Sequence, residues 1–459
     1  MKGSSEVRVP ITGLTVVLPL YLAIAPSYSR LQRRFADLGH RPNPANSADA
    51  HRPSVDVIIP CYNENAALLA ACLRSVRDQD YEGEVRVWVV DDGSDNRDEL
   101  LPVLRSHDIP PWRVLLMDEN QGKREAQASA LREGRGEVLV MIDSDTIVAR
   151  DGIRRIVAPL RDPLVGAVTG NLSASNAPAT WLTRLIDTRY RLLFERERAA
   201  QGNFGAVFCC AGPLSAYRRA VIEAVLPAYL GQQFCGGRRV FGDDLKLTNL
   251  VLAAGYRSVY EPAAEAATSV PTTLRRFVRQ QLRWNRSFYR ELPQMVRLLR
   301  SRSPYLAFDL AARTLLPALT AAGVVATAAD ALLAPRRLPL DLGALALMAI
   351  ASLDLGPSPA RVEGRRFAVG YGLVFIAVLL PVRFWAACTL FRNHWGTRDL
   401  TGHWRTRASS LRALPSAISF PFFRYSRIAR SNSRPASPWR PPRRSTSARS
   451  TRASARESS

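Results

Sequence analysis

The stretch VLVMIDSDTIV, residues 138–148, places two aspartates at the end of an apolar run. Apolar residues lead into Asp143 and Asp145, which only Ser144 separates, and apolar residues then resume. Alternate side chains of an extended segment point to the same side, so both carboxylates face together while Ser144 turns away. Such a pair suits Mg²⁺ or Mn²⁺ that also binds phosphate oxygens. The alternative is an ordinary strand ending in a polar turn, and the pair alone does not decide.

Three further runs share the pattern of a short, β-branched, apolar segment, which is typical of strands buried in a parallel sheet. With the first run, they are VDVIIP (55–60), VRVWVV (85–90), EVLVMI (137–142) and VGAVTG (165–170). Helical patterns lie between them, at residues 64–79 and 122–134. Alternating strands and helices predict an α/β domain over residues 53–273, built on a doubly wound parallel sheet.

Polar residues follow three of these predicted strands. Tyr62 and Glu64 follow the first strand, Asp92 follows the second, and Asp143 with Asp145 follows the third. Ligands of open parallel sheets bind beyond these strand ends. Because like charges a few ångströms apart repel strongly, an acidic rim of this kind requires a divalent cation and basic side chains.

Two pairs of charged residues are candidates to complete the rim. Lys123 and Arg124 stand at a predicted helix start, where such residues hold a diphosphate; the alternative is a solvated helix face. Asp243 and Asp244 open another predicted helix, where the alternative to catalysis is capping of the helix N-terminus.

Both ends of the chain carry membrane signals. Residues 11–29 hold no charge and precede RLQRR (30–34), which predicts a membrane helix whose C-terminal end faces the cytoplasm. The alternative is a secretory signal, which the trailing basic cluster disfavours. The later segment 274–300 mixes arginines with aromatic residues and leucines, as a helix on a membrane surface does. Three apolar stretches then follow, at 306–334, 338–353 and 367–391.

Charge and cysteine content narrow the cellular setting. The 459 residues carry a formal charge of +23, and 13 arginines but one acidic residue lie from Thr401 onward. The Ser/Arg/Pro-rich end, 431–459, is predicted to be disordered. Contact of this tail with anionic lipid or nucleic acid stays open, but a solvated tail is favoured and no specific nucleic acid is expected. Six cysteines without CxxC spacing fit free thiols in a reducing compartment.

Eight segments, taken in order, resemble the family 2 glycosyltransferases, and the resemblance extends from the N-terminal helix to about Arg398. They are VIIPCYNE, VVDDGS, NQGKREAQ, IDSDT, CCAGPLSAYRR, FGDDLKLTN, QQLRWNRSFYRE and WGTRD. Within that family they look most like the processive hyaluronan synthases, and CCAGP is also similar to chitin-oligosaccharide synthases of nodulating bacteria. The resemblance implies a GT-A fold inserted between N-terminal and C-terminal transmembrane helices, a UDP-sugar donor and inversion at the anomeric carbon.

The resemblance also implies roles for individual residues. The general base would be Asp244, with Asp243 beside it, and the metal ligand would be Asp145. The residues implied for the UDP-sugar are Tyr62, Glu64, Asp92, Lys123, Arg124 and Asp143. The residues implied for the acceptor and pyrophosphate are Gln280, Arg283 and Trp284, while Trp395 and Arg398 would close over the nucleotide. The family usually has Arg after the paired acids, whereas this chain has Leu245 there, which puts the neighbouring acceptor or phosphate contacts in doubt.

These inferences combine into one organisation of the chain. It comprises an N-terminal membrane helix (1–30), a cytoplasmic linker (31–52), the GT-A domain (53–273), interfacial helices (274–304), a C-terminal membrane region (305–391), the WGTR segment (392–430) and the basic tail (431–459). UDP-sugars are cytoplasmic, so we expect a multi-pass protein of the plasma membrane with its catalytic domain inside. An even number of crossings between 306 and 391 is then required, so that one stretch, 338–353, is expected to be re-entrant or interfacial.

The expected activity is polymerisation and export of a β-linked, amino-sugar-containing polysaccharide, with hyaluronan as the first expectation. The donors would be UDP-GlcNAc and UDP-GlcA, with the growing polysaccharide and the lipid bilayer as further partners. Two alternatives are a chitin-oligosaccharide synthase that uses UDP-GlcNAc only and a catalytically silent membrane scaffold. Leu245 is the one feature that favours the scaffold.

Overall fold

In the computed structural model, which describes residues 13–39, 52–234, 237–238, 241–300, 302–352 and 374–392, eight strands form one central sheet. From edge to edge they are β3 (Trp112–Leu116), β2 (Val85–Asp91), β1 (Val55–Cys61), β4 (Val138–Met141), β7 (Ser215–Arg218), β6 (Val165–Ala174), β10 (Arg257–Thr268) and β5 (Thr146–Val148). Strands β3, β2, β1 and β4 are parallel, with Val57 opposite both Val87 and Val140. A separate hairpin pairs β8 (Gln233–Phe234) with β9 (Gly237–Arg238).

The four strands predicted from the sequence are confirmed as β1, β2, β4 and β6, which all run in one direction, but the sheet also contains reversed strands that were not predicted. Strand β7 is antiparallel to both β4 and β6, and β5 is antiparallel to β10. The sheet is therefore mixed. The reversed strand β7 is the four-residue run SAYR, which is too short to show a hydrophobic period.

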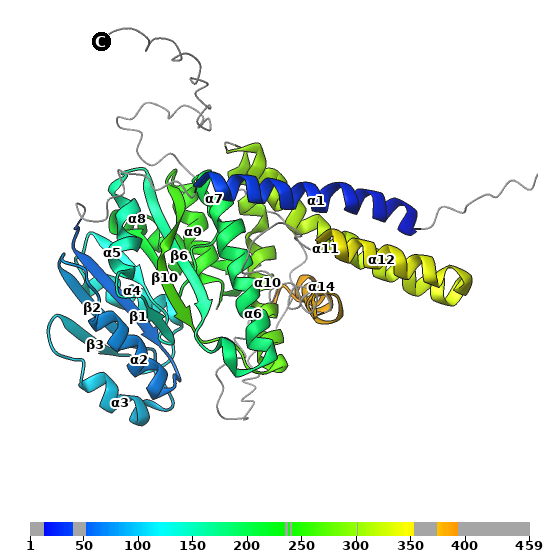
Figure 1. Ribbon diagram of the computed structural model, residues 1–459. Helices are drawn as coiled ribbons and strands as arrows, with labels where there is room; N and C mark the ends of the chain where they lie inside the picture. Colours follow the sequence, from blue (N-terminus) through cyan, green and yellow to red (C-terminus); the bar gives the residue numbers. More distant parts are fainter. Residues whose placement is uncertain are drawn as a thin grey trace, which may run out of the picture.

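Helices cover both faces of the sheet, as expected for a doubly wound domain (Figure 1). One face carries α2 (Ala66–Arg77), α3 (Arg97–Arg105), α5 (Gly152–Val157) and α6 (Trp181–Leu192), and the other carries α4 (Lys123–Glu133), α8 (Arg219–Leu230) and α9 (Asp243–Ala253). The domain also contains four short helical segments: η2 (Ala158–Arg161), η3 (Ala177–Ala179), η4 (Leu193–Arg198) and α7 (Ala199–Asn203). Strand β1 alternates between the faces, with Val57 and Ile59 in one core and Ile58 in the other.

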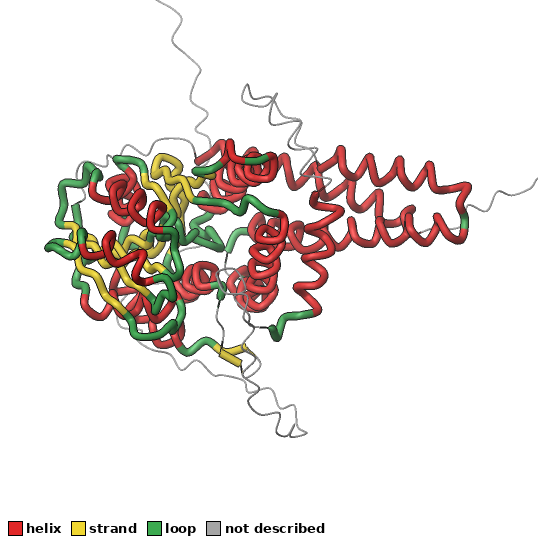
Figure 2. The backbone as a smooth tube through the Cα atoms, turned by 90° about the horizontal axis from the view of Figure 1, so that it is seen from below, coloured by secondary structure: helices red, strands yellow, loops and turns green. Residues whose placement is uncertain are grey.

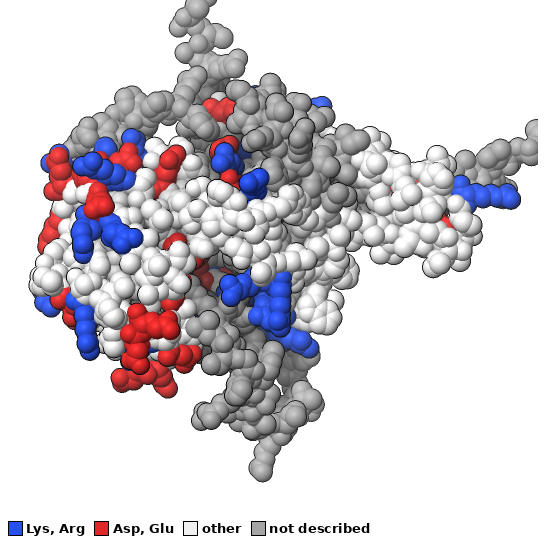
Figure 3. Space-filling view, turned by 60° about the horizontal axis from the view of Figure 1, so that its bottom comes forward, with Lys and Arg blue, Asp and Glu red and all other residues white. Residues whose placement is uncertain are grey.

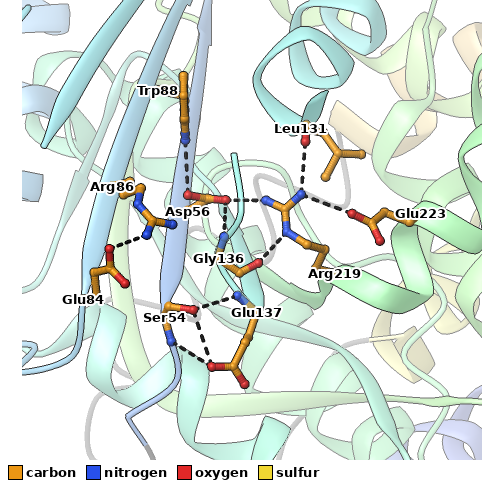
Figure 4. A network of polar contacts seen from close by, with 10 residues as sticks. All are labelled: Ser54, Asp56, Glu84, Arg86, Trp88, Leu131, Gly136, Glu137, Arg219 and Glu223. Carbon is orange, nitrogen blue, oxygen red and sulfur yellow. Dashed lines mark hydrogen bonds and ion pairs between the residues drawn. The ribbon is translucent and has the colours of Figure 1, made fainter. Parts of the chain in front are cut away.

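A buried polar network fixes the amino end of the sheet, away from the strand ends that carry the predicted site (Figure 4). The fully buried Asp56 accepts hydrogen bonds from Trp88 Nε1 at 3.2 Å and from the Gly136 backbone N–H at 2.6 Å, and it pairs with Arg219. Arg219 also donates to the Leu131 carbonyl at 3.0 Å. One guanidinium therefore ties the start of α8 to the end of α4 and to β1.

Three long helices form an arm that projects from the α/β domain (Figures 1 and 2). The arm comprises α1 (Gly13–Gly39), α11 (Pro304–Leu333) and α12 (Leu338–Ser352), with η5 (Pro335–Arg337) between the last two. Tyr21 and Ala25 of α1 pack with Met348 of α12. Most of the arm's visible surface carries no charged side chain, except toward its far end (Figure 3).

Among the described residues, α11 is the one helix long and apolar enough to cross a membrane. The helix expected at 11–29 corresponds to α1, and the second and third apolar stretches correspond to α12 and to the segment Phe375–Cys388, which comprises η6 (Phe375–Leu379) and α14 (Leu380–Cys388). This test concerns length and composition only, so every membrane crossing remains a prediction.

Helix α10 (Leu274–Leu299), expected from its basic amphipathic pattern, joins the α/β domain to α14. Two of its arginines donate to the chain at the end of α14: Arg286 to Thr389 Oγ1 at 2.8 Å and Arg290 to the Leu390 carbonyl at 2.9 Å. The Arg290 guanidinium also lies 4.7 Å from the ring centroid of Phe241, just before α9. The α10 helix thus connects the C-terminal helices to the start of α9.

Candidate active site

Three charged side chains meet where β4 ends and where α4 and α9 begin. Lys123 Nζ lies 2.6 Å from Asp143 Oδ1 and 3.7 Å from Asp244 Oδ1. Glycines with positive φ precede both helices, Gly122 at +98° and Gly242 at +89°, a backbone conformation that favours glycine. These turns bring the first residues of α4 and α9 to the carboxyl end of β4. The sequence prediction that Lys123, Asp143 and Asp244 share one site is consistent with this arrangement.

The Asp244 carboxylate lies between Lys123 and the segment around Gly212. The Gly212 backbone N–H donates to Asp244 Oδ2 at 3.0 Å. Burial raises the pKa of Asp244 to about 6, although Lys123 opposes the shift. Burial lowers the pKa of Lys123, but Asp143 and Asp244 outweigh that effect and raise it above its ordinary value. At neutral pH the site therefore holds a protonated lysine beside an ionised carboxylate, and that carboxylate is basic enough to accept a proton.

Asp145 lies at the same strand end, partly exposed, and Thr268 Oγ1 of β10 donates to its Oδ1 at 3.1 Å. In the part of the chain that the structure describes, no three His, Cys, Asp or Glu side chains are grouped as a metal cage. Asp145 alone fits Mg²⁺ or a similar divalent cation, because such cations can take one or two carboxylates from the protein and their other ligands from phosphates and water.

Asp92 is almost fully buried and supports the loop that leads to Lys123. Its carboxylate accepts the backbone N–H of Gln121 at 2.8 Å and that of Gly122 at 2.9 Å. Burial nevertheless raises the pKa of Asp92 to about 6, against the effect of these hydrogen bonds. The structure thus gives Asp92 a supporting role near the predicted diphosphate site.

Glu64 and Tyr62 follow β1, as predicted. Glu64 is buried and accepts the Ser144 hydroxyl at 2.6 Å. Ser144 and Asp145 lie in a turn in which the Thr146 backbone N–H donates to the Asp143 carbonyl at 3.0 Å, so the extended backbone expected for Asp143–Asp145 is wrong. Tyr62 is half-buried at the same edge.

Arg124 and Asp243 are placed differently from their neighbours Lys123 and Asp244. They pair with each other and are 7% and 5% exposed. Arg124 also donates to the Phe241 carbonyl at 3.2 Å. The predicted roles of Arg124 in diphosphate binding and of Asp243 in catalysis are not tested directly, but these contacts turn both side chains into the protein.

The predicted acceptor residues lie on α10. Trp284 is 46% exposed, and the Gln280 side-chain oxygen is buried without a hydrogen-bond donor among the described residues. Arg283 lies one turn before Ser287 on α10. Ser287 packs against Gly242, since a methyl group added to Gly242 would lie 2.5 Å from Ser287 Oγ. The α10 helix therefore passes close to the start of α9. Trp395 and Arg398 lie outside the described residues.

Leu245 and Lys246, where the sequence departs from the resemblance, both face α10. Leu245 packs against an apolar cluster that includes Phe208 and Met295. Lys246 Nζ contacts Glu291 at 3.4 Å and Gln294 Oε1 at 2.7 Å.

Residues 52–287 match the family described as glycosyltransferase like family 2, a segment that contains the whole central sheet and the Lys123, Asp143 and Asp244 site. An N-acetylglucosaminyltransferase of Sinorhizobium fredii (strain NBRC 101917 / NGR234) is 41% identical over 393 residues, which cover 83% of this chain and 94% of the relative. The chain belongs to glycosyltransferase family 2.

Other relatives of this glycosyltransferase carry the same description. An N-acetylglucosaminyltransferase of Rhizobium meliloti (strain 1021) is 39% identical over 394 residues, covering 84% of this chain and 92% of the relative. One from Rhizobium sp. (strain N33) is 44% identical over 354 residues, covering 75% and 77%. These names do not support a specific likeness to hyaluronan synthases. They fit the chitin-type alternative better.

The fold of the glycosyltransferase also resembles a solved structure, the mannosyltransferase PcManGT from Pyrobaculum calidifontis in complex with GDP-Man and Mn²⁺. The match has a TM-score of 0.54 at 23% identity and covers 82% of this chain and 99% of that chain. The likeness supports the GT-A fold for the α/β domain.

Two residues of the glycosyltransferase site were not found from the sequence. Gly212 lies within CCAGPLSAYRR, and no feature of that segment predicts a hydrogen bond from Gly212 to Asp244. Thr268 reaches Asp145 from the last strand, 123 residues away, and no local pattern predicts such a pair.

Proposed function

We propose that this glycosyltransferase transfers N-acetylglucosamine from UDP-GlcNAc to the end of a growing β-linked GlcNAc chain at the cytoplasmic face of the plasma membrane. The observation that carries the proposal is the contact of Asp244, a carboxylate with a raised pKa, with Lys123. The substrate class rests on relatives named N-acetylglucosaminyltransferase. Hyaluronan, the first expectation from the sequence, has no such support.

Asp244 is the proposed general base. The acceptor hydroxyl attacks the anomeric carbon, the bond from that carbon to the UDP oxygen breaks, and the hydroxyl proton passes to Asp244. This direct displacement inverts the anomeric centre. Removal of such a base costs about 10²- to 10⁴-fold in rate.

Lys123 is proposed to stabilise the diphosphate of the departing UDP, together with Arg283. The lysine remains protonated because two carboxylates lie beside it. A fixed cation at this position favours the charge that develops on the leaving group. Asp143 is then a residue that orients Lys123 through their 2.6 Å contact.

Asp145 is the proposed protein ligand of Mg²⁺ or Mn²⁺, with Thr268 orienting its carboxylate. The cation supplies Lewis-acid neutralisation of the diphosphate charge. Asp145 rather than Asp143 is proposed for the cation because Asp143 already pairs with Lys123.

Trp284 is the proposed platform for the acceptor sugar. Its side chain is 46% exposed, and it lies on the helix that passes close to the start of α9 through Ser287.

The helical arm is the proposed membrane segment. Large apolar side chains on it remain exposed, for example Leu332 and Leu333 at 85% and 84%. A soluble monomer rarely exposes an apolar surface of this extent, whereas a bilayer would cover it. Membrane location is also what the expected export of a polysaccharide requires.

The test is incorporation of radiolabelled sugar by membranes that contain the protein and Mg²⁺. We expect polymer from UDP-GlcNAc alone, sensitive to chitinase and resistant to hyaluronan lyase. A strict need for UDP-GlcA would restore the hyaluronan expectation, and a single sugar transferred to lipid would indicate a non-processive enzyme.

The Asp244→Asn variant separates an enzyme from a silent scaffold. We expect it to lose turnover while UDP still binds, because Asn keeps the shape of the side chain but cannot accept the proton. Equal product formation by the variant and the unmodified protein would exclude Asp244 as the base.

A further inference from the structure

Two ion pairs lie side by side where α4 and α9 begin. Lys123 and Asp244 form the first, 3.7 Å apart at the site. Arg124, which follows Lys123 on α4, and Asp243, which precedes Asp244 on α9, form the second pair. The first pair is partly exposed, with 19% and 34% of its side chains accessible, whereas the second is 9% and 5% exposed. Each helix thus leaves one charge partly exposed and keeps one inside.

The buried Arg124 contacts α9, the residue Phe241 just before it, and α8. It pairs with Asp243 of α9, donates to the Phe241 carbonyl at 3.2 Å, and lies 5.7 Å from the ring centroid of Tyr229 on α8. Tyr229 in turn donates its hydroxyl to Gln127 of α4 at 2.8 Å. These contacts hold the start of α9 against α4 and α8.

The start of α9 has no side-chain N-cap. Gly242 occupies the N-cap position and has no side chain to accept the first N–H groups of the helix. An Arg–carboxylate pair excluded from water is geometrically specific, and loss of one partner leaves an uncompensated buried charge. The pair is therefore suited to set where the adjacent Asp244 lies.

We propose that Arg124 and Asp243 are positioning residues that hold Asp244 in place beside Lys123, and that neither contacts donor or acceptor. The inference rests on the proposed function of Asp244 as the base. It assigns both residues roles different from those implied by the family resemblance, which placed Arg124 at the diphosphate and Asp243 among the catalytic acids.

The test compares Arg124→Gln, Asp243→Asn and the double variant in the purified full-length protein. We expect each single variant to lose up to about 10²-fold in kcat, since small displacements of a reacting group cost that much. The KM for UDP-GlcNAc and the Kd for UDP should change by less than about threefold, because no substrate contact is removed. The kcat of the double variant should be no lower than that of the less active single variant, since the two residues act as a unit. Arg124→Lys, which keeps the charge, should retain more activity than Arg124→Gln.

Three results would overturn the inference. An unchanged kcat in both single variants would show that the pair does not position Asp244. A loss in Asp243→Asn equal to that of Asp244→Asn, with Arg124→Gln active, would make Asp243 catalytic. A large rise in the UDP Kd of Arg124→Gln would place Arg124 at the diphosphate.

Hydrogen exchange gives a readout that does not need turnover. In Asp243→Asn we expect faster exchange of the amides at 246–249, the first that donate within α9, and unchanged exchange in strands β1, β2 and β4. The matched control is Lys246→Gln, which alters a contact between α9 and α10 beyond the pair. Should the unmodified protein transfer no GlcNAc, the proposed function fails while this measurement still decides whether the pair fixes α9. No local change in exchange would contradict the inference.

Discussion

The backbone N–H of Gly212 donates to Asp244 Oδ2 at 3.0 Å, and a side chain at Gly212 would occupy the space of the Lys123–Asp244 pair. An added methyl group would lie 2.8 Å from Lys123 Nζ and 2.9 Å from Asp244 Oδ2. A side chain at Gly212 would therefore push the end of Lys123 or of Asp244 aside, whereas the φ of Gly212 itself does not call for glycine. This contact links the segment before β7 to the proposed base.

We expect Gly212→Ala to lower kcat by about 10²-fold, because it displaces the Lys123 amino group or the base. The fold should persist, since the displaced atoms are the ends of side chains. Turnover and thermal unfolding, measured together, check this. Gly255→Ala is the control: its glycine has open space but a positive φ of +95°, so it should affect stability rather than kcat. Full activity in Gly212→Ala would mean that the site tolerates a different arrangement.

The pH dependence of turnover should follow Asp244. Burial raises its pKa to about 6, so the carboxyl becomes protonated and unable to accept a proton as the pH falls below that value. We expect kcat to be constant above about pH 7 and to fall about tenfold per pH unit well below 6. In Asp244→Asn this dependence should disappear along with the activity.

Asp92 should add a second acid-sensitive step that affects only kcat/KM. Its pKa is also raised to about 6 by burial, and its ionised form accepts the N–H groups of Gln121 and Gly122. Protonation in the free enzyme should loosen the loop before Lys123 and weaken donor binding. We therefore expect log kcat/KM to fall more steeply with decreasing pH than log kcat. Parallel curves would leave Asp92 without a role in donor binding.

Removal of divalent cations should abolish transfer. With Asp145 as the proposed protein ligand, EDTA should stop incorporation, and Mg²⁺ or Mn²⁺ should restore it. Asp145→Asn should raise the metal concentration needed for half-maximal activity. Thr268→Val, which removes only the hydroxyl that orients Asp145, should cause a smaller shift of the same sign. Activity that survives exhaustive chelation would contradict metal dependence.

The network around Asp56 should control stability rather than catalysis. Asp56→Ala leaves the Arg219 guanidinium and the Trp88 and Gly136 N–H groups without their buried acceptor. Breaking a buried ion pair in this way costs about 3–5 kcal/mol. Denaturant titration in detergent would measure the free energy of unfolding. The control is Glu223→Ala, which removes the exposed partner of Arg219 and should cost less than about 1 kcal/mol. Equal losses in the two variants would argue against the network.

Much of the fold could be predicted because its signals are local. The β-branched runs at β1, β2, β4 and β6 and the helical period at α2 and α4 are readable from neighbouring residues. Strands β3, β5, β7 and β10 of the central sheet were not predicted, since they are short or only partly buried and their pairing is set by distant segments.

The sequence by itself determined that acidic residues gather at one edge of the sheet, because the carboxyl ends of parallel strands share that edge. It also determined which helices carry the basic partners. Only the tertiary structure decided that Lys123 and Asp244 remain partly exposed while Arg124 and Asp243 face inward. Successive helical residues differ by about 100° in direction, so packing against neighbouring elements, and not the order of the residues, selects which charge of each adjacent pair stays exposed.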